Sequence, residues 1–191
     1  MKMYISGRWT TSRDSIELRS PYDGHVLGAV PSATPAQVDE AIASAGRGAG
    51  EMARLDRHRR AEVLGRAADL VEQRASEIAT SISEEVGKPI VEARAEVARV
   101  PDLIRLSAFE GTQARGESLP LDAQKGASSK LGITLRVPCG VVVAVTPFNY
   151  PLLLVVHKVA PALAAGNAVI LKPASSASSA AIKLTEILLE A

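Results

Sequence analysis

The stretch from Val141 to Lys172 restricts the possible folds of this chain more than any other part of the sequence. It begins with an unbroken apolar run, Val141 to Val145, which is typical of a strand buried on both faces. Thr146-Pro147 ends that strand, because proline cannot donate a hydrogen bond to a central ladder. A second apolar run extends from Ala168 to Leu171. Two such strands joined through a helix predict a parallel βαβ unit and therefore an α/β fold.

The segment between the two strands has the period of a helix. One helical face collects the apolar side chains Leu152, Val155, Val156, Val159 and Leu163. Gly166-Asn167 is a typical signal for the end of a helix. Ligands of parallel α/β sheets bind beyond the carboxyl ends of the strands. The candidate site therefore comprises residues 146–150 after the first strand and residues 172–175 after the second.

Charge and composition argue against several classes of function. Lys and Arg total 22 and Asp and Glu total 21, so a net charge of +1 offers no general attraction to nucleic acid or to an acidic membrane. A single cysteine is incompatible with an internal disulfide framework and fits a reducing compartment. No segment approaches the roughly 20 apolar residues of a membrane span, and the first residues contain no run of signal-peptide type. We expect a cytoplasmic protein that binds neither nucleic acid nor membrane.

Short strands and then helices are predicted before residue 116. Ser6-Gly7 favours a hairpin between Met3–Ile5 and Arg8–Thr10. Thr34 and Gln37 have the spacing of a capping box. The expected helices cover residues 35–45, 56–73, 75–85 and 90–110, and a last one covers 178–191.

The ends and interruptions of these helices also have local signals. Gly46, Gly48 and Gly50 indicate the end of the first helix, after an apolar stripe formed by Val38, Ala41, Ile42 and Ala45. Gly87 indicates the end of the third. Pro101 is expected to kink or divide the fourth, because proline lacks the donor and clashes with the preceding turn.

A cluster of basic residues stands where the second helix is expected to begin. It consists of Arg54, Arg57, Arg59 and Arg60. One interpretation is an anion site. The other is a solvated helix face interleaved with Asp56 and Glu62, and we favour this second interpretation.

Residues 117–138 read as a connector rather than as part of either flanking region. The alternation of Ile133, Leu135 and Val137 with polar residues predicts a half-exposed strand at its end. We therefore expect three parts: 1–116 with strands and helices, 117–138 as the connector and interface strand, and 139–191 with the βαβ unit and a further helix.

Several linked motifs resemble those of the aldehyde dehydrogenase superfamily, in the same order and at fitting separations. They are Tyr4-Ile5-Ser6-Gly7-Arg8-Trp9, Glu85-Val86-Gly87-Lys88-Pro89, Pro138-Cys139-Gly140-Val141-Val142, Thr146-Pro147-Phe148-Asn149-Tyr150-Pro151, Ala160-Pro161-Ala162-Leu163-Ala164-Ala165-Gly166-Asn167 and Lys172-Pro173. The resemblance implies a Rossmann-like cofactor domain, a preceding helical region and antiparallel strands used for assembly into a homo-oligomer. The family's cysteine nucleophile, general-base glutamate and second glycine-rich loop have no counterpart here. We therefore expect the N-terminal part of such an enzyme, inactive alone.

By this resemblance, Asn149 is the amide that holds the oxyanion of a thiohemiacetal. A fixed neutral donor can stabilise developing negative charge without the desolvation cost of a buried cation. The alternative role is a helix N-cap, for which asparagine is well suited. With the surrounding motif present, we favour the oxyanion role.

The same resemblance implies a nicotinamide dinucleotide, NAD or NADP, bound by residues of both strand ends: Thr146, Pro147, Phe148, Lys172, Ala174 and Ser175. Lys172 would reach the adenosine side of the dinucleotide, although a lysine at a strand end also reaches solvent readily. Members of the family that are strict for NAD tend to have a glutamate where this chain has Ser175. Serine does not repel a 2′-phosphate, so we expect NADP to be tolerated. Serines 175–179 can also cap the last helix.

Phe148-Asn149-Tyr150 resembles the branch that contains non-phosphorylating glyceraldehyde-3-phosphate, lactaldehyde and phosphonoaldehyde dehydrogenases. In the first of these an arginine after Glu-Val holds the substrate phosphate, and Arg99 matches it here. The alternative for Arg99 is an ion pair with Glu96 on an exposed helix face. The substrate is then a short aldehyde, with Arg99 and Tyr150 at its binding site.

Cys139 is not expected to be a catalytic residue. Cys139 precedes the first buried strand and so lies near its amino end, away from the ligand crevice, which argues against a catalytic role. The alternative to an enzyme is a non-catalytic nucleotide-binding or assembly fragment of the same scaffold. No metal ligands are predicted.

Overall fold

The two apolar runs form the parallel pair that the sequence predicts. In a computed structural model describing residues 1–191, β7 (Val141–Val145) pairs in parallel with β8 (Ala168–Lys172), so that Val141 lies opposite Ala168. The connecting helix α6 spans Leu153–Ala164. Gly166, at φ 86°, occupies the left-handed conformation that turns the chain from α6 into β8. The α/β class is therefore confirmed.

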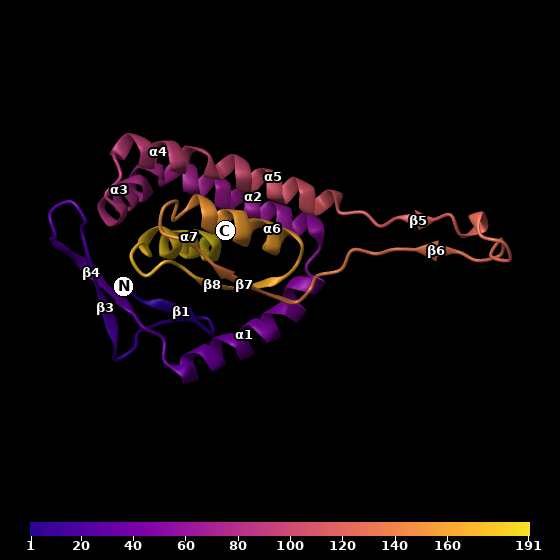
Figure 1. Ribbon diagram of the computed structural model, residues 1–191, viewed down its shortest axis with the longest axis horizontal. Helices are drawn as coiled ribbons and strands as arrows, with labels where there is room; N and C mark the ends of the chain where they lie inside the picture. Colours follow the sequence, from indigo (N-terminus) through magenta and orange to yellow (C-terminus); the bar gives the residue numbers. More distant parts are fainter.

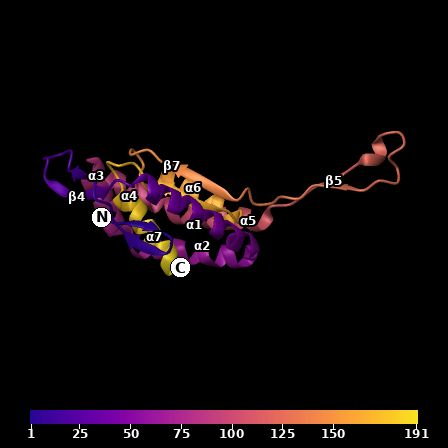
Figure 2. The ribbon, with the colours of Figure 1, turned by 90° about the horizontal axis from the view of Figure 1, so that it is seen from below.

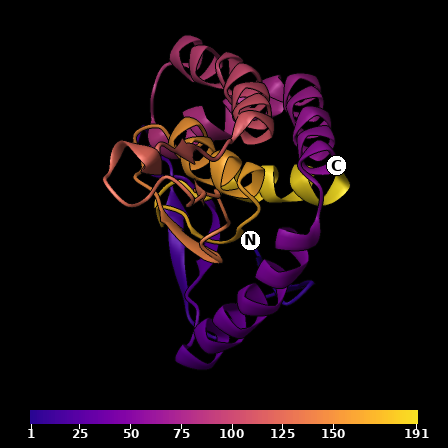
Figure 3. The same cartoon turned by 90° about the vertical axis from the view of Figure 1, so that its right-hand side faces the viewer.

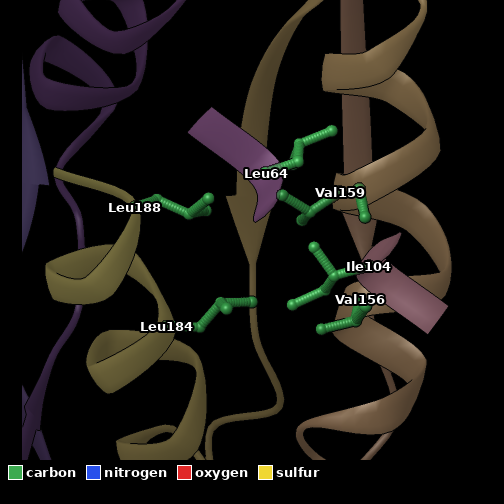
Figure 4. Close-up of a pocket in the computed structure, with 7 residues that line it drawn as sticks. Leu64, Ile104, Val156, Val159, Leu184 and Leu188 are labelled. Atoms are coloured by element: carbon green, nitrogen blue, oxygen red, sulfur yellow. The ribbon is translucent and has the colours of Figure 1, made fainter. Parts of the chain in front are cut away.

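A layer of helices covers one face of this pair and contains the core. In Figure 1, α2 (Arg57–Gln73) and α5 (Val100–Gln113) run side by side, with α6 between them and the strands, and α7 (Ser179–Glu190) packs on α2. The apolar side chains that meet there are Leu64, Ile104, Val156, Val159, Leu184 and Leu188 (Figure 4). The cavity between them has a volume of about 10 Å³, too small and too apolar to hold a ligand.

The long helical region before the connector is divided where the proline predicts. Helix α3 covers Ala75–Val86, α4 covers Ile90–Ala98, and α5 begins at Val100 with Pro101 in its first turn. Gly87 ends α3 with φ 74°, and a side chain there would come within 2.7 Å of Pro21. Glycine is thus required both for the backbone angle and for the close approach.

Helix α1 differs from its prediction. It covers Pro35–Arg54 and continues through all three glycines expected to end it. The predicted capping box is present, since Thr34 N donates to Gln37 Oε1 at 3.0 Å and Gln37 N donates to Thr34 Oγ1 at 3.3 Å. Glycine costs only about 1 kcal/mol in a helix interior, so it weakens a well-started helix without ending it. No residue of α1 is buried, because the helix descends away from the main helical layer (Figure 3).

The chain begins with two antiparallel hairpins. β1 (Met3–Ile5) pairs with β2 (Arg8–Thr10), as predicted, and β3 (Ser15–Arg19) pairs with β4 (Val26–Pro31). None of the helices combines the length and the apolar character that a membrane crossing requires.

The connector forms an arm that projects from the rest of the molecule (Figures 1 and 2). It contains β5 (Ser118–Leu119), the short helix η1 (Leu121–Ala123) and β6 (Gly132–Ile133). The predicted strand through Val137 is wrong beyond Ile133. Leu135 and Val137 lie in irregular chain and their side chains are 73% and 77% exposed.

Strand β7 is not buried on both faces, which corrects the first expectation. Ala144 packs into the core, but Val143 and Val145 on the other face are 63% and 57% exposed. Helix α1 covers that side chiefly over β8, where Gly48 approaches Ala168. The apolar run therefore indicated a strand correctly but overstated its burial.

Candidate functional site

Parallel pairing brings the carboxyl ends of β7 and β8 together. Thr146 N donates to Lys172 O at 3.2 Å, immediately beyond the last paired residues. Residues 146–150 and 172–175 therefore begin side by side, as expected for a ligand crevice. Thr146 is buried and Ser175 is half-buried, whereas Asn149 and Lys172 are exposed.

The loop after β7 is held from outside by a buried charge pair. Lys88 Nζ donates to Glu96 Oε2 at 2.8 Å and to the backbone carbonyl of Asn149 at 2.7 Å. The Glu96 side chain is fully buried and that of Lys88 is 11% exposed. The ammonium also lies 4.3 Å from the centroid of the Tyr150 ring, within the range of a cation–π contact.

Glu96 also caps α6. Its Oε1 accepts from Leu152 N at 2.9 Å and from Leu153 N at 3.1 Å, two of the N–H groups that a helix start leaves unpaired. A carboxylate there is further stabilised by the helix dipole.

This capping excludes one of the two roles considered for Asn149. Leu152 occupies the N-cap position and Glu96 makes the capping bonds, so the N-cap alternative is wrong. The carbonyl of Asn149 is held by Lys88, while its side-chain amide makes no hydrogen bond within the protein. The backbone is therefore fixed and the amide donors are free.

Arg99 lies at the junction of α4 and α5, exposed and without an ion pair. The alternative pairing with Glu96 is wrong, because Glu96 points inward to Lys88. The structure does not connect Arg99 to Tyr150 or Asn149 by any hydrogen bond. Its contact with substrate remains a prediction.

Most polar side chains around the strand ends have no hydrogen-bond partner in the protein. The hydroxyl of Thr146 is buried and has no hydrogen-bond partner. Neither the Lys172 ammonium nor the Ser175 hydroxyl bonds to another residue, whereas the Ala174 carbonyl accepts from Ser178 Oγ at 2.8 Å. A buried hydroxyl without a partner is costly and needs an explanation, which a ligand would supply.

Helix α7 is capped by Glu85 rather than by a serine. Ser178 occupies the N-cap position but its side chain makes no capping bond. The Glu85 carboxylate instead accepts from Ser179 N at 3.0 Å and from the Ser179 hydroxyl. Burial raises the pKa of Glu85, and the hydrogen bonds from Ser179 only partly oppose that rise.

Cys139 lies at the other end of β7. Its thiol donates to Asn167 Oδ1 at 3.2 Å, just before the strand begins. A strand of this length spans about 17 Å at about 3.3 Å per residue, so the thiol is far from Asn149. The position agrees with the expectation that Cys139 is not the nucleophile.

Comparison with known proteins identifies the family of this chain. Residues 9–191 match the profile of the aldehyde dehydrogenase family. The chain belongs to this family. It is 46% identical to an aldehyde-dehydrogenase-like protein of Sinorhizobium fredii over 95% of its own length and 36% of that protein's. It is 38% identical to the NADP-dependent glyceraldehyde-3-phosphate dehydrogenase of Streptococcus equinus, covering all of this chain and 40% of the relative.

A solved structure agrees with these relatives. The crystal structure of NADP-dependent glyceraldehyde-3-phosphate dehydrogenase from Bacillus halodurans C-125, complexed with NADP, has a TM-score of 0.95 at 38% identity. The match covers 99% of this chain and 40% of that one. The chain thus spans 36–40% of the length of the relatives named here.

Sequence reasoning missed the supporting roles of Lys88 and Glu96. A signal was present for Glu96, which stands in α4 beside the buried apolar residues Ala93 and Val97. A carboxylate on an apolar face needs a partner, and so indicates a buried interaction. Lys88 carried no such signal, because it follows the helix stop at Gly87.

Proposed function

We propose that this chain supplies the oxyanion donor and the first cofactor contacts of an enzyme that oxidises a short aldehyde to its acid with NAD or NADP. In this proposal the remaining part of a family member supplies the thiol nucleophile and the general base. The observation that carries it is the free side-chain amide of Asn149 on a loop whose backbone is clamped by Lys88.

Attack of a cysteine thiolate on the aldehyde carbon makes the carbonyl oxygen negative. The Asn149 amide would donate a hydrogen bond to that oxygen, together with a backbone N–H beside the nucleophile. Donors that are fixed before the reaction stabilise developing charge without reorganising. The hydrogen bond from Lys88 to the Asn149 carbonyl holds the backbone of this residue, which limits the positions that its amide can reach while leaving the side chain unused. Loss of hydride then leaves a thioester, which water hydrolyses to the acid.

The residues at the strand ends fit a nicotinamide dinucleotide. The unpaired hydroxyl of Thr146 is buried beside the crevice, and Lys172 offers a free ammonium for ribose hydroxyls or a phosphate. Ser175 brings no carboxylate that would repel a 2′-phosphate. The bound dinucleotide supplies the hydride acceptor. Pro147, Phe148 and Ala174 would line the same crevice.

The substrate would be a short aldehyde carrying a phosphate, a phosphonate or a hydroxyl group. Arg99 is exposed and has no carboxylate partner, so its guanidinium is available to an anionic substrate. Tyr150 would line the substrate side of the loop. The phosphorylated substrate in the names of two relatives supports this choice.

The decisive test is Asn149→Ala in the protein that contains this chain and the rest of a family member's length. Loss of an oxyanion donor is expected to lower kcat by about 10²–10³, with a smaller change in KM. Asn149→Asp is the matched variant, because it keeps the shape and removes the N–H donors. Recovery of activity in the aspartate variant would show that the residue acts only through packing.

Three further measurements test the finer points. We expect kcat/KM for NAD and NADP to differ by less than a hundredfold, about 2.7 kcal/mol; a larger preference for NAD would show that Ser175 does not set the choice. Arg99→Ala should weaken turnover of anionic aldehydes more than of neutral ones. The 191-residue chain alone should have no turnover; activity that disappears in Cys139→Ser would contradict the proposal.

A further inference from the structure

A cavity of about 300 Å³ lies at the opposite end of β7 from Asn149. It is bounded by the end of α1, the start of α2, the end of α5 and the segment just before β7. Its charged lining consists of Arg54, Arg57, Arg60, Arg136 and Asp56. Four cations therefore face one carboxylate.

None of these four arginines has an acidic partner, although they gather around one cavity. Arg8 pairs with Glu40 at 2.9 Å, Arg59 with Glu62 at 2.9 Å, and Arg105 with Glu72 at 2.6 Å. No ion pair joins any cavity arginine to Asp56 or to another carboxylate within 4.0 Å. The solvated-face interpretation of the cluster holds for Arg54, Arg57 and Arg59, which are exposed, but is wrong for Arg60, which is 8% exposed.

Arg60 is fixed in the wall of the cavity. Its Nε donates to the carbonyl of Ala164 at 3.0 Å, and its Nη1 donates to the carbonyls of Leu55 and, at 3.4 Å, Met52. Its Nη2 makes no hydrogen bond to the protein and is not completely buried. The guanidinium is therefore oriented in advance, with donors left over.

Arg57 and the start of α2 add to this arrangement. Arg57 Nη1 donates to the carbonyl of Ala114 at 2.6 Å, which holds a second guanidinium against the cavity. Asp56 is the N-cap of α2 but its side chain makes no capping bond, so the first N–H groups of this 17-residue helix are uncapped. Uncapped helix starts favour anions. Arg54 and Arg136 are exposed and unbonded, and so are free to close over a bound group.

The electrostatic state of Arg60 is consistent with a missing counter-ion. Burial lowers the pKa of Arg60, the nearby charge of Arg57 lowers it further, and the charge of Asp56 only partly opposes these two effects. An anion in the cavity would oppose both effects.

We propose that this cavity binds a phosphate group, either free or as the phosphoryl end of a small molecule. Guanidinium forks match phosphate oxygens two at a time, and here two of them are already held in place by carbonyls. A volume of about 300 Å³ is at the small end of ligand pockets and admits a phosphorylated metabolite rather than a polymer. The site is separate from the strand ends, so it does not depend on the proposed oxidation.

The test is calorimetric titration of the 191-residue chain with sodium phosphate, and separately with glycerol phosphate, at ionic strength matched with sodium chloride. We expect saturable binding with one site per chain. Equal affinities identify free phosphate as sufficient, and tighter binding of the ester identifies a phosphorylated molecule; both support the site.

Variants locate the binding. Arg54→Ala combined with Arg136→Ala removes two exposed side chains that hold no part of the fold, and should weaken binding at least tenfold. Arg60→Lys should weaken it as well, since lysine loses the fork. Arg59→Ala is the control on the same helix and should leave binding unchanged, because Arg59 pairs with Glu62 outside the cavity.

Three results would overturn the proposal. One is phosphate binding that does not saturate, or that chloride at the same concentration abolishes. Another is a loss in Arg59→Ala as large as in the double variant. The third is competition by NADP, which would place the phosphate at the strand ends instead.

Discussion

Two asparagines lie at opposite ends of the β7–α6–β8 unit and are used in opposite ways. Asn167 is buried, and its Oδ1 accepts from Gly140 N at 2.9 Å while its Nδ2 donates to the carbonyl of Ala162 at 3.1 Å. Asn149 is exposed, and its side chain makes no hydrogen bond to the protein. The same amide thus belongs to the fold at one end and remains available at the other.

The difference extends beyond these two residues. At the amino end of the strands, the side-chain bonds of Asn167 join the turn after α6 to the residues that precede β7. At the carboxyl end, the side chains of Thr146, Lys172 and Ser175 have no partners in the protein. Satisfied groups stabilise the fold, whereas unsatisfied ones are characteristic of a place where something binds.

The carboxyl end keeps its shape because the helical region supports it. Glu96 and Glu85, from α4 and α3, cap α6 and α7 respectively. Lys88 connects the first of these caps to the Asn149 carbonyl. Support therefore comes through backbone groups, and the side chains at the strand ends stay free.

The largest expected effect comes from removing this support. Glu96→Ala leaves the buried Lys88 cation unpaired and two N–H groups of α6 uncapped, so we expect a loss of about 3–5 kcal/mol in the free energy of unfolding, measured with urea. Glu96→Gln keeps an acceptor for the N–H groups and should lose less. A loss below about 1 kcal/mol for the alanine variant would show that the loop does not depend on this pair.

The asparagine pair provides the next test. Asn167→Ala leaves Gly140 N without its partner, although the Ala162 carbonyl still accepts from the backbone N–H of residue 167, and should cost about 1–3 kcal/mol of stability. Asn149→Ala should change stability by less than about 0.5 kcal/mol, as is usual for an exposed residue without contacts. Similar losses of stability in the two variants would show that the two asparagines contribute equally to the fold.

The sequence predicts the frame of this comparison well. The unbroken apolar runs locate β7 and β8, the period of 3.6 locates α6, and Pro101 locates the division between α4 and α5, because these signals depend on neighbouring residues alone. The position of the candidate site follows from the strand ends. The assignment of Asn149 and the cofactor residues came from family resemblance, and their roles remain predictions.

Contacts between distant segments could not be predicted in this way. Glu96 caps a helix 56 residues further along the chain, and Glu85 caps one 94 residues further. Arg60 is held by the carbonyl of Ala164, the last residue of α6, which lies 104 residues away in sequence. Local patterns show that a helix face is apolar but not which charged group completes a neighbouring helix.

A smaller effect, of opposite sign, is expected for Thr146. Thr146→Val replaces a buried hydroxyl that lacks a partner and should raise the free energy of unfolding by about 0.5–1 kcal/mol, while weakening NADP binding to the chain. Thr34→Val is the matched control, because that hydroxyl caps α1 and its loss should cost about 1 kcal/mol. Destabilisation by Thr146→Val would indicate that the Thr146 hydroxyl makes a hydrogen bond in the ligand-free protein. Thr146 would then not belong to the strand-end side chains that lack a partner.

The smallest effect is a dependence of stability on pH, and it separates the two supporting carboxylates. Glu96 has a cation at 2.8 Å, whereas Glu85 has none within ion-pair distance, and burial raises its pKa. The native state then binds a proton at Glu85 more tightly than the unfolded chain does. The contribution of Glu85 to the free energy of unfolding is therefore greatest below the ordinary glutamate pKa of about 4.3, and falls as pH rises through the raised value.

Glu85→Gln keeps an acceptor for Ser179 N but cannot titrate. As pH rises from about 4.3 through the raised pKa of Glu85, the unfolding free energy of this variant should therefore fall less than that of the wild type. Urea unfolding at half-unit steps of pH, with the exposed neighbour Glu84→Gln as the control, measures the difference. If the Glu85→Gln profile follows the wild type throughout, the carboxylate is as well satisfied as Glu96. The charge of Lys183, which lies one turn into α7 and pairs with Glu77, would then be enough to offset the burial of Glu85.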